Sequence, residues 1–136
     1  MEIDNERLEI SKPRLLLVED DVKATTMTVK YLEKRFEIDS AINCDEAVNK
    51  AKEKDYDAFL MDIGLPGNSN GMDTTKKLKE IKDNKNKPFI AVTAYAMPEY
   101  KEYFLSEGLT HYIAKPFEFT DLIKLIDEAL GRNFDS

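Results

Sequence analysis

The chain has 136 residues, of which 42% are apolar and 35% are charged, which suits one domain with a buried core and a well-solvated surface. Asp and Glu number 27 against 20 Lys and Arg, so the formal charge is −7, and this balance argues against direct binding to nucleic acid or to an anionic membrane. No apolar run approaches the ~18 residues of a membrane span. Cys44 is the only cysteine, so no disulfide can form within the chain and a cytoplasmic location is expected.

The first part of the chain predicts strand, helix, strand and helix in turn. An unbroken apolar run over 14–18 predicts a strand buried on both faces. Apolar residues three, four or seven apart predict a helix over 22–36, for which Asp21 is the expected N-cap. Residues 36–42 predict a second strand. The next helix is indicated by a capping-box pattern and one apolar stripe, formed by Asn43, Glu46, Ala47, Val48 and Ala51.

The same alternation continues to the end of the chain. Further strands are predicted at 58–61, 89–92 and 109–114, and further helices around 72–81, 97–104 and 119–130, with Gly108 and Gly131 as stops. Five strands alternating with five helices predict an α/β fold, a flavodoxin-like doubly wound (βα)5 domain with a five-stranded parallel sheet. The expected strand order is 2-1-3-4-5. We expect this domain over residues 13–132, preceded by a flexible N-terminal arm at 1–12 and followed by a C-terminal tail at 133–136.

Polar residues follow four of the predicted strands at the point where each apolar run stops. They are Glu19 and Asp20, then Asp62, then Thr93, and finally Lys115. The carboxyl ends of parallel strands meet at one edge of a sheet, so these side chains are expected to converge there. Taken singly, each has an ordinary explanation as a helix cap, a hydroxyl bonded to local backbone, or a surface lysine.

Four sequence blocks carry a resemblance to a known family. The blocks LLLVEDD, FLMDIGLPG, IAVTAYAM and HYIAKPF resemble the signatures of the receiver domain of two-component response regulators, in the same order and spacing over 14–131. The blocks MDIGLPG and TAYAM most resemble receivers attached to hybrid histidine kinases. The chain is therefore interpreted either as a stand-alone regulator or as a fragment of a longer protein.

The resemblance implies a phosphoacceptor site in which Asp62 takes a phosphoryl group from the phosphohistidine of a sensor histidine kinase or a histidine phosphotransfer protein. Three carboxylates repel one another unless a cation is present, and hard oxygen ligands suit Mg²⁺, for which Mn²⁺ is an expected substitute. The implied roles are direct Mg²⁺ ligation by Asp20 and Asp62, water-mediated ligation by Glu19, a backbone ligand from Gly64, and phosphoryl contacts from Lys115 and Thr93. The family also holds the Lys115–Pro116 peptide bond cis.

The resemblance further implies a switch. Thr93 is expected to move toward the acyl phosphate and Tyr112 to fill the space that it leaves, which shifts an existing two-state equilibrium. A partner-binding face is then expected at Tyr95, Met97, Tyr100, Tyr112 and Phe119. Gly64 and Tyr95 stand where receivers tune phosphate lifetime, and they predict slow to moderate self-dephosphorylation. The loop 67–71 looks about one residue longer than the common form.

Other classes of protein remain as alternatives. A Mg²⁺-dependent aspartyl-phosphate phosphohydrolase would share the acids at the sheet edge, but Gly64 replaces the second acid that such enzymes use. A receiver-like adaptor that takes no phosphate is disfavoured by the complete set of acids, hydroxyl and lysine. The preferred interpretation is a signalling module that catalyses only its own phosphorylation and dephosphorylation. It contacts neither nucleic acid nor membrane, and it is a monomer or a phosphorylation-dependent dimer.

Overall fold

The computed structural model describes residues 12–64, 70–95 and 97–132. Five strands pair in parallel in the order β2-β1-β3-β4-β5, which confirms the predicted flavodoxin-like order. The strands are β1 (Arg14–Val18), β2 (Glu37–Ala41), β3 (Ala58–Ile63), β4 (Phe89–Thr93) and β5 (His111–Ala114). The helices are α2 (Val22–Leu32), α3 (Cys44–Glu53), α4 (Asn70–Lys79), α5 (Pro98–Ser106) and α6 (Phe119–Ala129), with a short 3-10 turn η1 (Asn84–Asn86).

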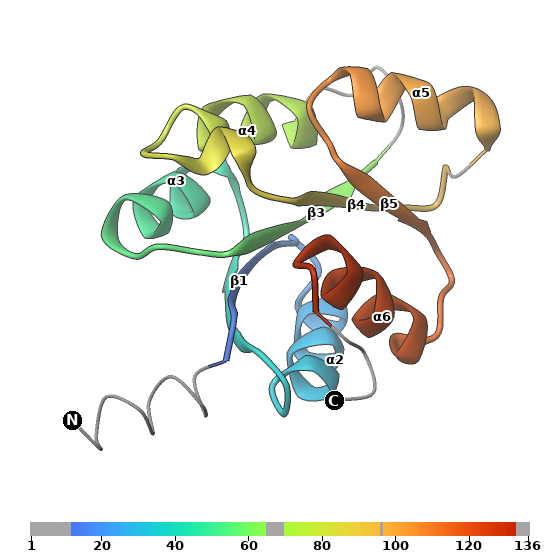
Figure 1. The fold of residues 1–136 in the computed structure, drawn as a ribbon, viewed down its shortest axis with the longest axis horizontal. Helices are drawn as coiled ribbons and strands as arrows, with labels where there is room; N and C mark the ends of the chain where they lie inside the picture. The colour runs from blue at the N-terminus through green and yellow to red at the C-terminus, as the bar shows by residue number, and fades with distance from the viewer. Residues whose placement is uncertain (1–11, 65–69, 96, 133–136) are drawn as a thin grey trace.

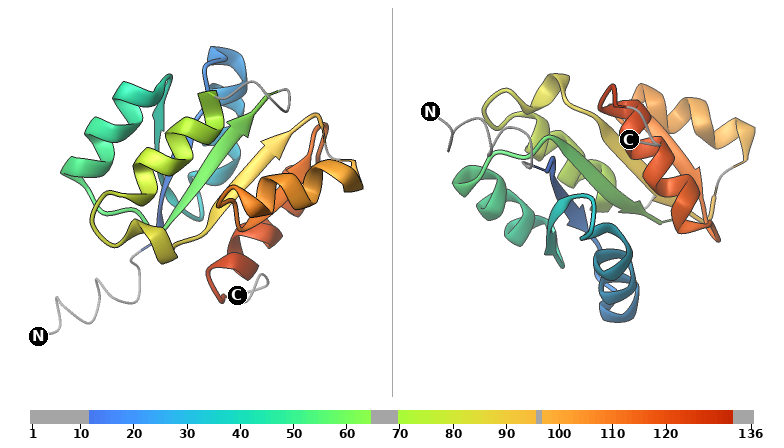
Figure 2. Two further views of the ribbon diagram at one scale, coloured as in Figure 1. Left: turned by 90° about the horizontal axis from the view of Figure 1, so that it is seen from above. Right: turned by 60° about the horizontal axis from the view of Figure 1, so that its bottom comes forward.

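The helices form one layer on each side of the sheet. Helices α3, α4 and α5 cover one face, and α2 and α6 cover the other (Figure 1). Figure 2 shows the same two layers from above and from below. Side chains of a strand alternate between the two faces, so each central strand contributes to two cores. Leu16 and Phe59 pack with the first group of helices, and Leu17 and Leu60 with the second.

The structure confirms the predicted N-terminal caps of α2 and α3. The Asp21 side chain caps α2 by accepting a hydrogen bond from the Lys23 amide at 3.0 Å. Asn43 caps α3 by accepting from the Glu46 amide at 2.9 Å. The Glu46 carboxylate in turn accepts from the Ile42 amide at 3.0 Å, one residue earlier than in the standard capping box. These two helix starts are therefore specified locally.

Several predicted boundaries are wrong by a few residues. Helix α2 ends at Leu32, because a turn over the next residues brings Phe36 into the core, where it is 1% exposed. Strand β3 continues through Asp62 to Ile63, because both residues still pair with β4. Strand β5 begins at His111, since the Leu109 amide still donates a hydrogen bond to the Phe104 carbonyl of α5. The 3-10 turn η1 was not predicted.

Two packing contacts hold α2 against α6. The ring of Tyr31 on α2 stacks on the ring of Phe119 at the start of α6, with centroids 4.4 Å apart. Arg35, which follows the end of α2, forms an ion pair of 2.7 Å with the fully buried carboxylate of Asp127 near the end of α6. The C-terminal end of α2 and the residues after it are therefore held against both ends of α6.

Some sequence-based expectations fall outside the described residues. These are the arm over 1–11, the tail at 133–136 and most of the loop over 67–71. Among the helices of the described ranges, none is long and apolar enough to cross a membrane.

Candidate functional site

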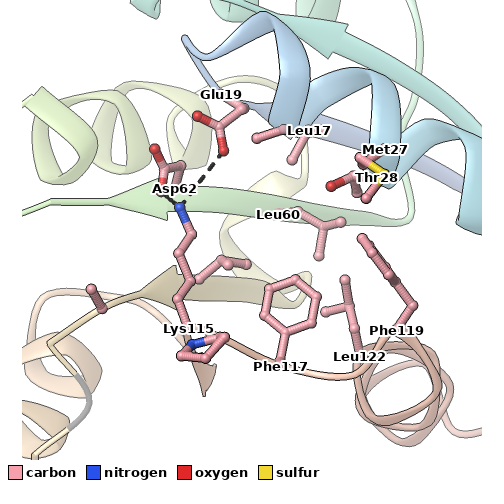
Figure 3. A pocket seen from close by; sticks show the side chains of 14 residues that line it. Leu17, Glu19, Met27, Thr28, Leu60, Asp62, Lys115, Phe117, Phe119 and Leu122 are labelled. Atoms are coloured by element: carbon pink, nitrogen blue, oxygen red, sulfur yellow. Dashed lines mark hydrogen bonds and ion pairs between the residues drawn. The ribbon is translucent and has the colours of Figure 1, made fainter.

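The acidic side chains meet at the carboxyl edge of the sheet, on the face that α2 and α6 cover. Leu17 and Glu19 are two residues apart along the chain leaving β1, and Leu60 and Asp62 are two apart on β3, so each acid follows an apolar side chain that points to the same face. Figure 3 shows Glu19 and Asp62 beside the amine of Lys115. Strand alternation therefore places charge directly above the apolar floor of this face.

The Lys115 amine joins two of these acids. Its Nζ donates a hydrogen bond to Asp62 Oδ1 at 2.7 Å and lies 3.8 Å from Glu19 Oε1. The Lys115–Pro116 peptide bond is cis, as the family resemblance implies. The lysine that the sequence placed after the fifth strand is therefore a member of the acidic site.

Three carboxylates form a cluster that fits a divalent cation. Glu19, Asp20 and Asp62 each offer one oxygen, and these oxygens lie within 4.8 Å of one another. Glu19 is 7% exposed, whereas Asp20 faces solvent. A set of carboxylate oxygens with an open side is the donor set that Mg²⁺ prefers. The residues present therefore fit the predicted ion, and Gly64, the proposed backbone ligand, follows β3 directly and is exposed.

The charges in the site shift two pKa values. Burial raises the pKa of Glu19 to about 7, a hydrogen bond from the Asp21 amide opposes this rise, and the negative charge of Asp62 adds to it. For Lys115, burial opposes the charged form, but the hydrogen bond and charge of Asp62 outweigh burial and raise its pKa. Without a cation, Glu19 therefore shares its proton with solvent near neutral pH.

The hydroxyl of Thr93 is not hydrogen-bonded to the acids in the described residues. Thr93 is fully buried, and its Oγ1 accepts a hydrogen bond from the Tyr95 amide at 3.0 Å. In the ladder, Thr93 is the partner of Ile63, whereas Val92 is the partner of Asp62. Its side chain therefore starts on the sheet face opposite the carboxylates.

Four of the five residues expected in a partner-binding face lie on or near α5 and β5. The ring of Tyr95 meets the ring of Tyr100 edge to face at 6.3 Å. Lys101 lies over the Tyr112 ring at 5.6 Å, and Met97 is 56% exposed. The fifth, Phe119, lies apart from them because its ring stacks on α2.

Sequence reasoning missed a cavity of about 490 Å³ that opens beside the acids, between α2 and α6. Its lining includes Leu17, Ala24, Met27, Thr28, Leu60, Phe117, Phe119 and Leu122, together with Glu19, Asp62 and Lys115. Only the small residues Ala24 and Thr28 on an otherwise amphipathic helix hinted at it. The depth of a gap between two helices depends on their tertiary spacing, which a helical period does not encode.

Comparison with known proteins supports the geometry. The family of response regulator receiver domains matches residues 15–127. Transcription factor prr1 of Schizosaccharomyces pombe is 36% identical over 121 residues, which is 88% of this chain and 22% of prr1. The transcriptional regulatory protein ResD of Bacillus subtilis is 29% identical over 125 residues, which is 91% of this chain and 50% of ResD. The chain thus spans half or less of the length of these relatives.

Comparison with solved structures also shows similarity to receiver domains. The receiver domain of a sensor histidine kinase from Pseudomonas aeruginosa PAO1, solved with a magnesium ion coordinated in its active-site cleft, has a TM-score of 0.77 and 30% identity, over 89% of this chain and 99% of that one. The family match extends through every strand from β1 to β5 and nearly to the end of α6. Sequence blocks, strand order and site geometry agree, and the chain belongs to the response regulator receiver domains of two-component systems.

Proposed function

We propose that Asp62 accepts a phosphoryl group from a phosphohistidine and that the resulting aspartyl phosphate switches a protein-binding face. One observation carries the proposal: the Lys115 amine lies 2.7 Å from Asp62 within a cluster of three carboxylates. Receiver domains take their phosphoryl group from histidine kinases or histidine phosphotransfer proteins, and they bind Mg²⁺ at an acidic site. A partner of this kind is therefore the expected donor for this chain.

The transfer is a displacement at phosphorus. A carboxylate oxygen of Asp62 forms the new bond as the phosphorus–nitrogen bond of the donor breaks, and the electron pair of that bond remains on the imidazole, which takes up a proton. Mg²⁺, when bound, neutralises the charge that gathers between the carboxylates and the phosphoryl oxygens. Glu19 and Asp20 would hold it together with Asp62 and the Gly64 carbonyl, and Mn²⁺ offers the same oxygen chemistry.

Lys115 orients the acceptor before transfer and then stabilises the product. Its hydrogen bond fixes the Asp62 carboxylate, and the high pKa of Lys115 keeps the amine charged. After transfer, the same amine pairs with a phosphoryl oxygen, which is a charge-assisted contact on a preorganised donor. The lysine is thus a catalytic residue of this self-phosphorylation.

The switch begins at Thr93. To reach the phosphoryl group, its hydroxyl gives up the hydrogen bond from the Tyr95 amide, which lies in the segment that leads to α5. Tyr112 on the neighbouring strand, beneath Lys101 of α5, then moves into the vacated space. These shifts reorganise the face of α5, β5 and α6 that carries Met97, and a monomer–dimer change would use the same face.

Phosphate lifetime depends on the two positions beside the site. Gly64 has no side chain to orient an attacking water, and the Tyr95 ring is large enough to shield the phosphoryl group. We expect slow to moderate self-dephosphorylation. A decay of the phosphorylated form within seconds at room temperature in Mg²⁺, measured by intact-protein mass spectrometry, would contradict this expectation.

The single cysteine, Cys44, fits a reducing cytoplasmic compartment.

The decisive experiment uses Mg²⁺ with acetyl phosphate, and beryllofluoride as a non-hydrolysed mimic. Wild type should gain one phosphoryl group at Asp62, located by peptide mass, and Asp62→Asn should gain none. Asp45→Asn, an exposed acid on α3, is the matched control and should be phosphorylated like wild type. A folded wild type that takes no phosphoryl group would indicate an adaptor, and steady phosphate release from monoesters would indicate a hydrolase.

A second experiment tests the switch. Addition of beryllofluoride should shift the amide resonances of α5, and Tyr112→Ala should reduce these shifts by at least half while those beside Asp62 persist. Tyr31→Ala, on the other face of the sheet, is the control. Equal α5 shifts in wild type and Tyr112→Ala would remove Tyr112 from the mechanism.

A further inference from the structure

The cavity between α2 and α6 is a second structural feature of the site. It measures about 490 Å³, within the range of cavities that hold small organic ligands. Leu17, Leu60 and Val92 of the sheet form its floor, while residues of α2 and of the segment from 116 to 122 form its walls. Figure 3 shows the phenyl rings of Phe117 and Phe119 on its α6 side. The interior is therefore almost wholly apolar.

The two contacts described above between α2 and α6 lie at the C-terminal end of α2. There the Tyr31 ring stacks on Phe119, and Arg35, just beyond the helix, pairs with Asp127. In its first turn, α2 presents the small side chain of Ala24 to the cavity. A concave, mostly apolar space of this size beside a few charged groups has the character of a site for a small ligand.

A hydroxyl in the wall of the cavity has no hydrogen-bond partner among the described residues. Thr28 is only 9% exposed, and its Oγ1 forms no hydrogen bond with the part of the chain that the structure describes. Figure 3 shows this hydroxyl on the cavity side of α2. The hydroxyl is accessible from the cavity, and a ligand with a polar atom at this position would form a hydrogen bond with it. This observation is independent of the acidic cluster.

The opposite end of the cavity is charged. Glu19, Asp62 and Lys115 all line it, and Asp20 lies within the same cluster of carboxylates. Three carboxylates against one ammonium leave this end negative at a pH where all are ionised, so it attracts a cation and repels an anion. Long apolar walls that lead from a negative end complement an amphiphilic cation.

We propose that this cavity binds a small organic cation, an ammonium or amidinium group on an apolar body that also carries a hydrogen-bonding atom for Thr28. The cationic group pairs with Glu19 and Asp62, and the apolar body lies between α2 and α6. The inference deepens the proposed function, on which it rests for its consequence: the ligand occupies the position of Mg²⁺, so the two compete, and occupancy opposes phosphorylation of Asp62.

Three matched probes test the charge requirement. (6-Methoxynaphthalen-2-yl)methylamine carries the cation, the corresponding methanol is neutral, and the corresponding carboxylate is an anion. Titration of the full chain, followed by calorimetry and amide chemical shifts, should show the amine binding at least tenfold more tightly than the alcohol, with the anion weakest. Saturating Mg²⁺ should weaken the amine at least threefold. Equal binding of all three probes would overturn the proposal.

Two variants test the location. Ala24→Leu fills the cavity and should weaken the amine probe at least tenfold. Thr28→Val keeps the size of the side chain but removes the hydroxyl, and should weaken the same probe about threefold. Thr26→Val is the matched control, because its hydroxyl already bonds the Val22 carbonyl at 2.9 Å on the exposed side of α2. Unchanged binding in both folded cavity variants would overturn the proposal.

The outcomes separate this inference from the proposed function. Wild type that takes a phosphoryl group at Asp62 but does not bind the amine would overturn the cavity ligand alone. Wild type that binds the amine, is sensitive to Ala24→Leu and takes no phosphoryl group would support the ligand site and overturn the phosphoacceptor role.

Discussion

On one face of the sheet, α3, α4 and α5 cover a core built around the stacked rings of Phe59 and Phe89, whose centroids lie 4.3 Å apart. On the other face, α2 and α6 cover smaller aliphatic side chains such as Leu17 and Leu60 and leave a cavity of about 490 Å³. The carboxylates point to this second face. The less completely filled side of the sheet is therefore also the side that carries the site.

The contrast separates two tasks within one domain. Large buried rings supply stability, because each removes a large apolar area from water. A site for an ion and a phosphoryl group needs access and unpaired charge instead, and both of these cost stability. The two faces share the same strands, so the packed face supports the more open one through a common backbone.

The largest expected effect is on the packed face. Phe59→Ala removes a fully buried ring from its stack on Phe89, and should lower the free energy of unfolding by about 3–5 kcal/mol. Urea denaturation followed by circular dichroism measures the loss. A loss below ~2 kcal/mol would show that this face is not the principal source of stability.

The second prediction concerns the charge on the other face. In the folded metal-free protein the pKa of Glu19 is about 7, above the ordinary 4.5. The folded state therefore holds this proton where the unfolded chain has released it, so stability should fall as pH rises through this window, by up to about 3 kcal/mol. The Glu19→Gln variant should not show this part of the decrease in stability. Parallel stability profiles of the two proteins without Mg²⁺ would refute the assignment.

A third prediction compares the truncation of a side chain beside the cavity with a truncation in the filled core. Leu122 of α6 is buried but lines the existing space, so Leu122→Ala loses fewer packing contacts than a truncation in a filled core. The free energy of unfolding should fall by about 2 kcal/mol, at the low end for such changes. A loss equal to that of Phe59→Ala would erase the difference between the faces.

The smallest effects on stability come from the helix caps, and they should be equal on both faces of the sheet. Asp21 caps α2 and Asn43 caps α3, and a cap acts on its own helix whatever the packing beneath. Replacement of either residue by Ala should cost about 1 kcal/mol, measured in 0.5 M NaCl to screen the charges near Asp21. Costs that differ strongly between the two caps would mean that local and tertiary contributions cannot be separated here.

Sequence patterns predicted the sheet order and the acidic edge because both depend on local rules. Alternation along strands places Glu19 and Asp62 on one face, and parallel pairing brings their strand ends together. The face on which the Thr93 hydroxyl lies was beyond such rules, since it depends on the register of β4 against β3. The turn η1 was missed because its buried Asn84 is held by the Leu78 carbonyl, which sequence periodicity does not reveal.

The placement of Phe119 also depended on tertiary structure. The helical period places Phe119 on the apolar face of its helix but does not identify its packing partner. That partner is Tyr31 because of the relative position of α2 and α6. The cavity has the same origin, because residues such as Ala24 line it from separate helices. The order of the strands and the edge where their ends meet were predicted, whereas features that depend on the distance between two helices were not.

The proposed acceptor, Asp62, lies inside a strand and not beyond its end. Asp62 and Ile63 both continue the ladder with β4, so the backbone that would bear the phosphoryl group is held by inter-strand hydrogen bonds. We expect modification to move this backbone very little. The sheet therefore serves as a stationary reference frame, and any displacement that carries the signal must arise in the connecting segments around it, such as the one through Tyr95.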